Sequence, residues 1–238
     1  MSLLAINNIY HGDCLSLMPY LLDSSIDMIL CDLPYGTTQN KWDSVIPLDL
    51  LWKQYERIIK DNGAIVLTAQ TPFDKVLGSS NLKLLKYEWI WQKTEPTGFL
   101  NAKKSPLKAH ENILIFYKKQ PVYNPQKTKG KPYSYKKENI ISENYGKSDG
   151  TDLIINNGDR MPISVQIFKK DKGLHPTQKP VALFEYLIKT YTNAGDLVLD
   201  NCAGSGTTGV ACKNTQRNVI MIEENLKYCE IAAKRYFT

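Results

Sequence analysis

The sequence predicts an α/β protein with a mainly parallel sheet and helices on both faces of that sheet. Short apolar runs rich in β-branched residues alternate along the chain with segments of helical periodicity. The apolar runs are continuous rather than alternating, which is typical of strands buried on both faces. With 238 residues, 42% of them hydrophobic, the chain is long enough for one domain of this class with an insert.

The individual elements follow from this patterning. Residues 26–35 and 64–70 are expected to be buried strands, and between them the amphipathic segment 48–63 is expected to be a helix that Gly63 ends. Further along, the patterns predict a strand pair at 87–93 and 111–119, a helix at 179–192, a strand at 196–200, a helix at 208–214, and a strand followed by a helix within 218–236.

Positive charge is concentrated in one part of the chain. The formal net charge is +6, and residues 118–172 hold 12 of the 30 Lys and Arg but only 6 of the 24 Asp and Glu. Within this part, residues 124–152 are rich in Lys, Gly, Ser, Asn and Tyr and too polar to form a core of their own. A neutral body with one basic segment favours a local contact with a polyanion, although a solvated loop would have the same composition.

Several classes of protein are disfavoured by composition. No run reaches the ~18 apolar residues of a membrane span, and the N-terminus lacks the features of a signal peptide. The five cysteines form no CxxC pair and there are only three histidines, so neither a disulfide scaffold nor a metal site is expected. These observations predict a soluble, intracellular protein.

A glycine-rich turn follows the strand that ends at Asp200. Gly204, Gly206 and Gly209 allow the backbone to pass close to a ligand, and the following helix N-terminus offers free N–H groups. Glu223, at the end of the next strand, suits hydrogen bonds to ribose hydroxyls. The turn therefore predicts a nucleoside-containing cofactor. A nicotinamide cofactor also fits the glycine spacing, but only 29 residues follow Gly209, too few for the usual succession of strands and helices.

A second motif, Asp32-Leu33-Pro34-Tyr35, lies at the carboxyl end of its predicted strand. In an open parallel sheet, the carboxyl ends of the strands face the ligand crevice, so both motifs can meet there.

Together these motifs resemble those of the β group of S-adenosylmethionine-dependent DNA amino-methyltransferases. The residues 32–35 are similar to the (Asp/Asn/Ser)-Pro-Pro-Tyr motif, and residues 200–208 are similar to the Phe-x-Gly-x-Gly cofactor motif. The segment 175–180, His-Pro-Thr-Gln-Lys-Pro, and the segment 12–15, Gly-Asp-Cys-Leu, resemble two further motifs in the order of that group. Leu33 and Cys202 depart from the family pattern, which has Pro and an aromatic residue there.

The resemblance implies a Rossmann-like methyltransferase fold with a mostly parallel seven-stranded sheet and a circularly permuted motif order. Residues 1–238 would form a single catalytic domain, with residues 120–172 as an inserted target-recognition region. The implied catalytic residues are Asp32, Leu33, Pro34 and Tyr35, where Asp32 accepts an N–H of the target amine and Tyr35 stacks on the base. The implied residues of the S-adenosylmethionine site are Asp13, Cys14, His175, Thr177, Lys179, Asp200, Cys202, Gly204, Ser205, Gly206, Thr207 and Glu223. Of these, the 175–179 stretch, including Lys179, is expected to hold the methionine carboxylate.

The basic segment is then the expected DNA-binding region. Its lysines can neutralise phosphates and its tyrosines can stack or form hydrogen bonds. The expected contacts are Lys127, Lys129, Lys131, Tyr133, Tyr135, Lys136 and Lys137.

The activity expected from the resemblance is site-specific methylation of adenine N6, on a base flipped out of double-stranded DNA. The alternatives are cytosine-N4 methylation, RNA or single-stranded DNA as the substrate, and a binding protein that kept the fold without catalysis. A homodimer, a cytoplasmic location and a bacterial or phage origin are also implied by the resemblance alone.

Overall fold

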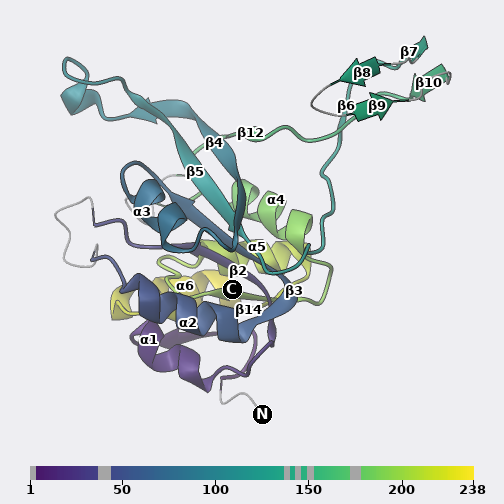
Figure 1. Cartoon of the computed structure of the whole chain (residues 1–238). Coiled ribbons are helices and arrows are strands. Elements are labelled where there is room, and N and C mark those ends of the chain that lie inside the picture. The colour runs from purple at the N-terminus through teal and green to yellow at the C-terminus, as the bar shows by residue number, and fades with distance from the viewer. Residues whose placement is uncertain (1–3, 37–43, 137–139, 143–145, 149–152, 172–177) are drawn as a thin grey trace. The chain divides into compact units, whose positions relative to one another are not determined.

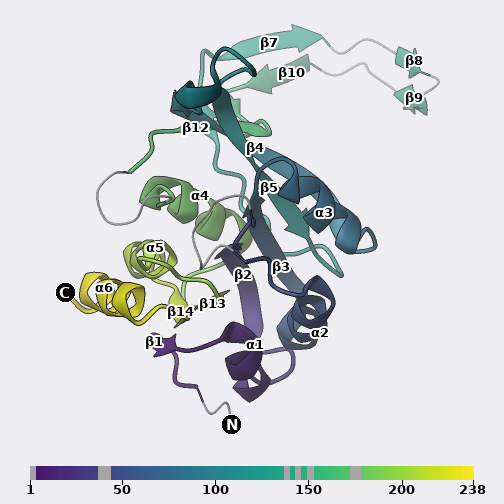
Figure 2. The same ribbon diagram turned by 90° about the vertical axis from the view of Figure 1, so that its left-hand side faces the viewer.

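The computed structural model describes residues 4–36, 44–136, 140–142, 146–148, 153–171 and 178–238. Its central feature is an eight-stranded sheet with the order β1-β14-β13-β2-β3-β5-β4-β12 (Figures 1 and 2). The strands are β1 (Asn8–His11), β2 (Ile26–Asp32), β3 (Ile59–Ala69), β4 (Leu85–Thr97), β5 (Lys108–Phe116), β12 (Val165–Phe168), β13 (Leu197–Asp200) and β14 (Asn218–Glu223).

The sheet is mostly parallel, as the continuous apolar runs predict. Only β5 runs antiparallel to its neighbours β3 and β4. The strand count differs from the expected seven, because β12 adds in parallel to β4 at the edge, with Val165 opposite Ile90. The sequence gives little sign of this strand, since its residues alternate between exposed and half-buried positions.

Helices cover both faces of the sheet (Figure 2). One face packs against α1 (Cys14–Leu17), the short 3-10 turn at Met18–Tyr20, α2 (Leu48–Ile58) and α3 (Phe73–Ser80). The other packs against α4 (Val181–Tyr191) and α5 (Thr207–Thr215), and α6 (Leu226–Phe237) lies against α5, β1 and β14. Side chains of β2 alternate between the two cores, since Ile29 belongs to the first and Met28 and Leu30 to the second. This two-sided burial explains why the β2 sequence shows no polar alternation.

The helix predicted at 48–63 is shorter in the structure. Helix α2 ends at Ile58, and Ile59 already begins β3, where it pairs with Ile26 of β2. The pairing contains an irregularity between Ile26 and Met28, so the first residues of β3 join the sheet out of register with the rest. Gly63 therefore lies inside a strand and does not end the helix.

Residues Pro125–Ile163 form a second compact unit, separate from the unit of Met1–Asn124 and Ser164–Thr238. It consists of short antiparallel pairs: β6 (Thr128–Lys129) with β11 (Asp159–Arg160), β7 (Tyr133–Lys136) with β10 (Leu153–Asn156), and β8 (Ile140–Ser142) with β9 (Gly146–Ser148). Among residues 125–136 and 153–163 of this unit, no hydrophobic side chain is buried. This agrees with the prediction that the segment is too polar for a core.

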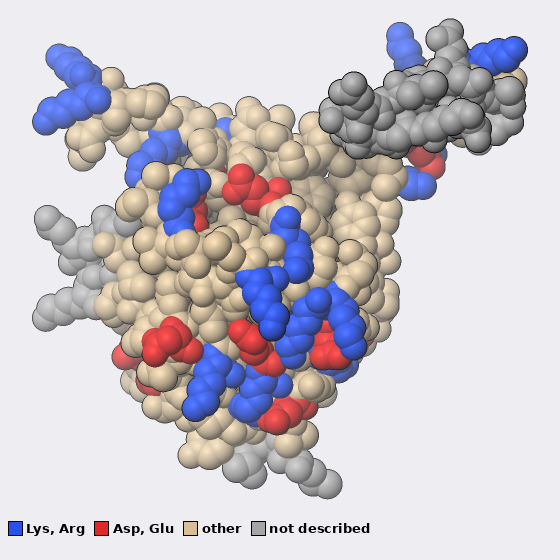
Figure 3. Space-filling model, in the orientation of Figure 1, with Lys and Arg blue, Asp and Glu red and all other residues tan. Residues whose placement is uncertain are grey.

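Acidic and basic side chains intermingle over the face that carries α2 (Figure 3). Several form ion pairs there, among them Arg57 with Asp23 at 2.6 Å and Lys60 with Asp27 at 2.6 Å. Charge on this face is thus locally balanced. None of the described helices is both long and apolar enough to cross a membrane.

Candidate active site

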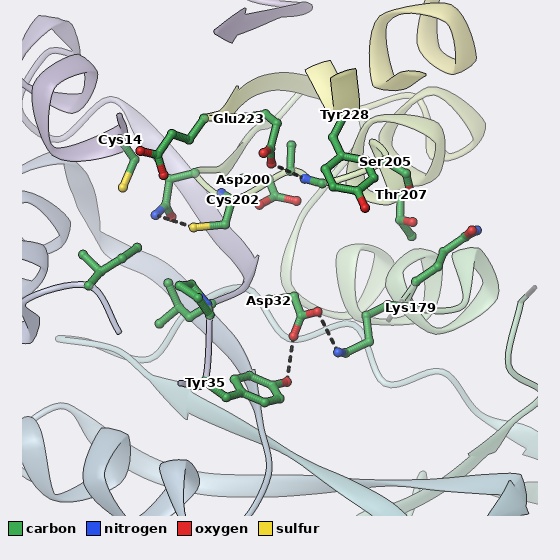
Figure 4. A pocket seen from close by; sticks show the side chains of 18 of the residues that line it. Cys14, Asp32, Tyr35, Lys179, Asp200, Cys202, Ser205, Thr207, Glu223 and Tyr228 are labelled. Atoms are coloured by element: carbon green, nitrogen blue, oxygen red, sulfur yellow. Dashed lines mark hydrogen bonds and ion pairs between the residues drawn. The ribbon is translucent and has the colours of Figure 1, made fainter. Parts of the chain in front are cut away.

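A pocket of about 750 Å³ opens at the carboxyl ends of the parallel strands (Figure 4). Asp32, Asp200 and Glu223 are the last residues of β2, β13 and β14, and all three line it. Asp13 follows β1 and lines the same pocket. The topology thus brings the two sequence motifs to one edge of the sheet, as a parallel sheet requires.

Most of the residues singled out from the sequence line this pocket. They are Asp13, Cys14, Asp32, Leu33, Pro34, Tyr35, Lys179, Asp200, Cys202, Gly204, Ser205, Thr207 and Glu223. His175 and Thr177 lie outside the described residues. Gly206 does not line the pocket.

The glycine turn connects β13 to α5 through two left-handed residues. Gly204 has φ +51°, and its N–H donates to Glu223 Oε2 at 2.7 Å. This hydrogen bond joins the turn to the end of β14. Gly206 has φ +79°, and a Cβ placed there would lie 2.7 Å from Ala232 Cβ of α6. The expected role of Gly206 in the cofactor site stays a prediction, and the structure gives a separate reason for a glycine there, because α6 passes close to it.

Acidic residues of the pocket are anchored by backbone or hydroxyl donors. Asp13 caps α1 by accepting from the Ser16 N–H at 2.7 Å. Asp200 is buried, accepts from the Cys202 N–H at 3.1 Å, and also accepts from the Thr208 hydroxyl. Burial raises the pKa of Asp200 to about 7 despite these donors. Burial also raises the pKa of Glu223, which accepts from Gly204 N–H.

Three thiols lie together below the glycine turn. The thiols of Cys14 and Cys31 are close enough to Cys202 to affect its titration, and the Asn201 amide lies 3.6 Å from its sulfur. These contacts with the other two thiols, followed by burial, raise the pKa of Cys202. Asn201 is in turn held by Tyr55, whose buried hydroxyl donates to Asn201 Oδ1 at 2.6 Å. All of these cysteines are free.

The carboxylate of Asp32 is held by three donors. Tyr35 Oη donates to Oδ1 at 2.7 Å and Thr68 Oγ1 donates to the same oxygen at 2.5 Å. Lys179 Nζ lies 2.6 Å from the other oxygen, Oδ2 (Figure 4). Burial, followed by the charge of Asp32, raises the pKa of Tyr35 well above its ordinary range, so Tyr35 remains a donor at neutral pH. One ring face of Tyr35 packs on Phe73 at a centroid distance of 5.3 Å.

Lys179 lines the pocket as expected, but its partners differ from the expected one. Its side chain is 6% exposed and pairs with Asp32 and, at 3.2 Å, with Glu111 Oε2. Instead of a free ammonium for a cofactor carboxylate, the structure has a lysine already paired with two protein carboxylates. A buried ammonium is stable only with such partners.

Sequence reasoning missed several polar residues of the pocket, among them Lys93, Glu111 and Asn201. Gln178 Oε1 is buried and has no hydrogen-bond partner among the described residues. A signal was present for two of them, because Lys93 follows the apolar Trp89 and Trp91 of a strand and Glu111 precedes the apolar run 113–116. A charge at the end of a buried strand is uncommon unless it is paired or functional.

Comparison with known proteins decides the family. The profile of the N6_N4_Mtase family, described as DNA methylase, matches residues 26–234. This chain belongs to that family of DNA methylases. Among relatives of this DNA methylase, Type II methyltransferase M2.MboI of Moraxella bovis is 29% identical, covering 96% of this chain and 87% of the relative. Type II methyltransferase M.HpaI of Haemophilus parainfluenzae is 30% identical, covering 90% and 69%. DNA adenine methyltransferase YhdJ of Escherichia coli K12 is 28% identical, covering 95% and 81%.

Solved structures agree with the fold of the methylase. The crystal structure of the M1.HpyAVI–SAM complex matches with a TM-score of 0.67 and 27% identity, covering 96% of this chain and 98% of that one. The cytosine-N4-specific PvuII DNA methyltransferase has a TM-score of 0.71 at 16% identity, covering 96% and 85%, which is a likeness of fold alone. Within the described part of the chain, no group of three or more His, Cys, Asp or Glu side chains could hold a metal ion.

Proposed function

We propose that this DNA methylase transfers a methyl group from S-adenosylmethionine to the N6 amine of adenine in duplex DNA. The observation that carries the proposal is the Asp32 carboxylate, fixed in a pocket of about 750 Å³ with the Leu33-Pro34-Tyr35 backbone beside it. The similarity to relatives named as methyltransferases, one of them adenine-specific, supports the choice of reaction and base.

The pocket residues fit the cofactor. A pocket of this volume is in the usual range for a ligand of that size. Glu223 has acceptor capacity left after binding the Gly204 and Asn225 N–H groups, which suits ribose hydroxyls. Gln178 Oε1, buried and without a donor among the described residues, suits an ammonium group. The cofactor, when bound, supplies an activated methyl group on a sulfonium.

The contribution of the protein is positioning and electrostatics. An exocyclic amine is a weak nucleophile because its lone pair is delocalised into the ring. Asp32 accepts one N–H of the amine and a backbone carbonyl of Leu33 or Pro34 accepts the other, which directs the lone pair towards the methyl group. Leu33 serves as well as proline here, because the backbone carbonyl and not the side chain makes the contact.

We further propose that Pro125–Ile163 is the region that contacts DNA. Tyr133 and Tyr135 are exposed and stack on each other at 5.9 Å, with Arg160 4.7 Å above the Tyr133 ring. Exposed aromatic rings beside cations suit contacts with bases and phosphates. Lys129 and Lys127 both approach Asp159, Lys131 and Lys136 are exposed, and Lys137 lies outside the described residues.

The test is nucleoside mass spectrometry of mixed-sequence duplex DNA after incubation with the protein and labelled S-adenosylmethionine. N6-methyladenine made by the wild-type protein and absent with Asp32→Ala supports the proposal. The matched control is Asp61→Asn, which removes an exposed carboxylate paired with Lys119 outside the pocket.

Other products refute parts of the proposal. N4-methylcytosine would retain the mechanism and replace the base. Labelled cofactor bound without any methylated nucleoside, on duplex DNA, single-stranded DNA and RNA, would refute catalysis. A homodimer, which the family resemblance implies, is tested by sedimentation of the same preparation.

A further inference from the structure

Four charged side chains of alternating sign form a continuous buried series behind the Asp32 carboxylate. Asp32 Oδ2 lies 2.6 Å from Lys179 Nζ, which lies 3.2 Å from Glu111 Oε2. Glu111 Oε1 lies 2.6 Å from Lys93 Nζ. The side chains of Lys179, Glu111 and Lys93 are 6%, 10% and 6% exposed, so three of the four charges are nearly removed from water.

The sheet places these residues together from distant parts of the chain. Glu111 of β5 pairs with Trp91 of β4, and Lys93 is two residues further along β4 on the same face as Trp91. Lys179 precedes Pro180, the N-cap of α4. Thr68 of β3, which holds the other oxygen of Asp32, pairs with it across β2 and β3.

The series is neutral only as a whole. A buried charge without a partner is strongly unfavourable, and removing one member exposes its neighbour to that penalty. Burial acts to lower the pKa of Lys179, but the charges of Asp32 and Glu111 outweigh it and the pKa lies above its usual range. Burial acts to raise the pKa of Glu111, and the charges of Lys179 and Lys93 outweigh it in the opposite direction. Lys179 and Glu111 are therefore both ionised at neutral pH.

The two oxygens of Asp32 are unequal. Oδ1 already accepts from two hydroxyls, those of Tyr35 and Thr68, while Oδ2 has Lys179 alone. Since each carboxylate oxygen has about two acceptor positions, Oδ2 is the atom with capacity for a substrate N–H. The position of the Lys179 ammonium therefore determines which acceptor position of Oδ2 is open to the target amine.

We propose that Glu111, held in place by Lys93, is a positioning residue for methyl transfer: as the second anion beside Lys179 it fixes the ammonium on one side of Asp32 Oδ2, which keeps Oδ2 oriented and leaves its other acceptor position to the target amine. This inference rests on the proposed function. Glu111 acts through Lys179 and makes no contact with Asp32. Without it, the ammonium of Lys179 has Asp32 as its sole carboxylate partner and is free to move across Oδ2, into the position that the target amine needs.

The test compares Glu111→Gln, which keeps the shape and removes the charge, with the wild-type protein. The matched control is Glu88→Gln, which changes a carboxylate of β4 that lies outside the pocket and binds Asn112 at 2.8 Å. We expect kcat of the Glu111 variant to fall by about 10- to 100-fold, as for a misplaced catalytic group. The dissociation constant of S-adenosylmethionine, measured by calorimetry, should stay within about threefold. The control should change neither.

The pH profile of kcat provides a readout that loss of stability alone would not move. Lys179 faces Asp32 from β2, Glu111 from β5 and the ring of Tyr35 at 5.4 Å. Removing the Glu111 charge removes one of the two anions that raise the pKa of Lys179. The alkaline limb of kcat should therefore move to lower pH in the variant.

Three outcomes overturn the proposal: an unchanged kcat, an unchanged alkaline limb, or a loss confined to cofactor affinity. If Glu111→Gln does not fold, the Lys93→Met/Glu111→Gln double variant carries the test, because it removes one charge of each sign and leaves Lys179 paired with Asp32. The same expectations apply to it. An absence of methylated base with the wild-type protein would instead refute the proposed function, which separates the two failures.

Discussion

The two left-handed glycines of the cofactor turn should respond differently to the same substitution. Gly206→Ala places a methyl group 2.7 Å from Ala232 Cβ and 2.9 Å from Ala232 Cα. One of these atoms is backbone, so α6 must move to make room. An alanine at φ +79° also carries the left-handed penalty of about 1–2 kcal/mol, and overpacking adds about 1–3 kcal/mol.

Gly204→Ala is the matched control. Its φ is +51°, but nothing lies within 4 Å of the added Cβ, so only the conformational penalty of about 1–2 kcal/mol remains. Because Gly204 lines the pocket, its new methyl group occupies ligand space. We expect the free energy of unfolding of this variant to fall by no more than that penalty. We expect it to bind S-adenosylmethionine at least about tenfold more weakly than the wild type, which corresponds to about 1.4 kcal/mol.

Thermal denaturation and cofactor titration of both variants separate the two roles. The sum for Gly206→Ala is about 2–5 kcal/mol, which lowers Tm by between about 4 and 20 °C in a chain of this size. A Gly206→Ala protein that melts with the wild type but binds the cofactor poorly would refute the reasoning. It would show that Gly206 is needed for cofactor binding and that α6 can move away from the added methyl group without a loss of stability.

Three further predictions concern buried groups around the pocket. The pKa of Asp200 is raised from 3.8 to about 7, so its contribution to the free energy of unfolding is full below pH 3.8 and is lost as the pH rises to about 7. The Asp200→Asn variant should not show this decrease in stability, which urea unfolding at intervals across that pH range measures. Tyr55→Phe leaves the buried Asn201 carbonyl without its donor and should cost about 1–3 kcal/mol in the same assay, whereas an unchanged midpoint would mean that another donor replaces it. The pKa of both Cys202 and Cys212 is raised, so the half-buried Cys202 should react with iodoacetamide before the buried Cys212 only at alkaline pH, and S-adenosylmethionine should protect it; peptide mass spectrometry reads both.

Sequence patterning was sufficient where local chemistry decides the structure. The apolar run of β2 predicts burial on both faces, and Met28 and Ile29 do lie in opposite cores. The end of α2 could not be predicted in this way, because the amphipathic pattern continues past Ile58. What ends the helix is the pairing of Ile59 with Ile26, a contact between residues 33 positions apart.

The glycine pattern shows a second limit of local reading. Gly204 and Gly206 have the same place in a ligand-binding turn as far as sequence is concerned. Only the packing of α6 distinguishes them, since Ala232 approaches one and nothing approaches the other. Spacing predicts that the backbone turns sharply here, whereas the need for glycine at position 206 depends on Ala232, 26 residues further along the chain.

Glu111 escaped prediction for a reason that follows from topology. In a parallel sheet, catalytic and ligand-binding residues are expected at the carboxyl ends of the strands, and Asp32, Asp200 and Glu223 all lie there. Strand β5 runs antiparallel to β3 and β4, so its first residues lie at the edge where its neighbours end. A polar residue near the start of β5 therefore faces the same pocket as residues at the ends of β2, β13 and β14. In a mixed sheet, the search for functional residues must include the beginning of each antiparallel strand, and here that rule leads directly to the carboxylate that pairs with Lys179.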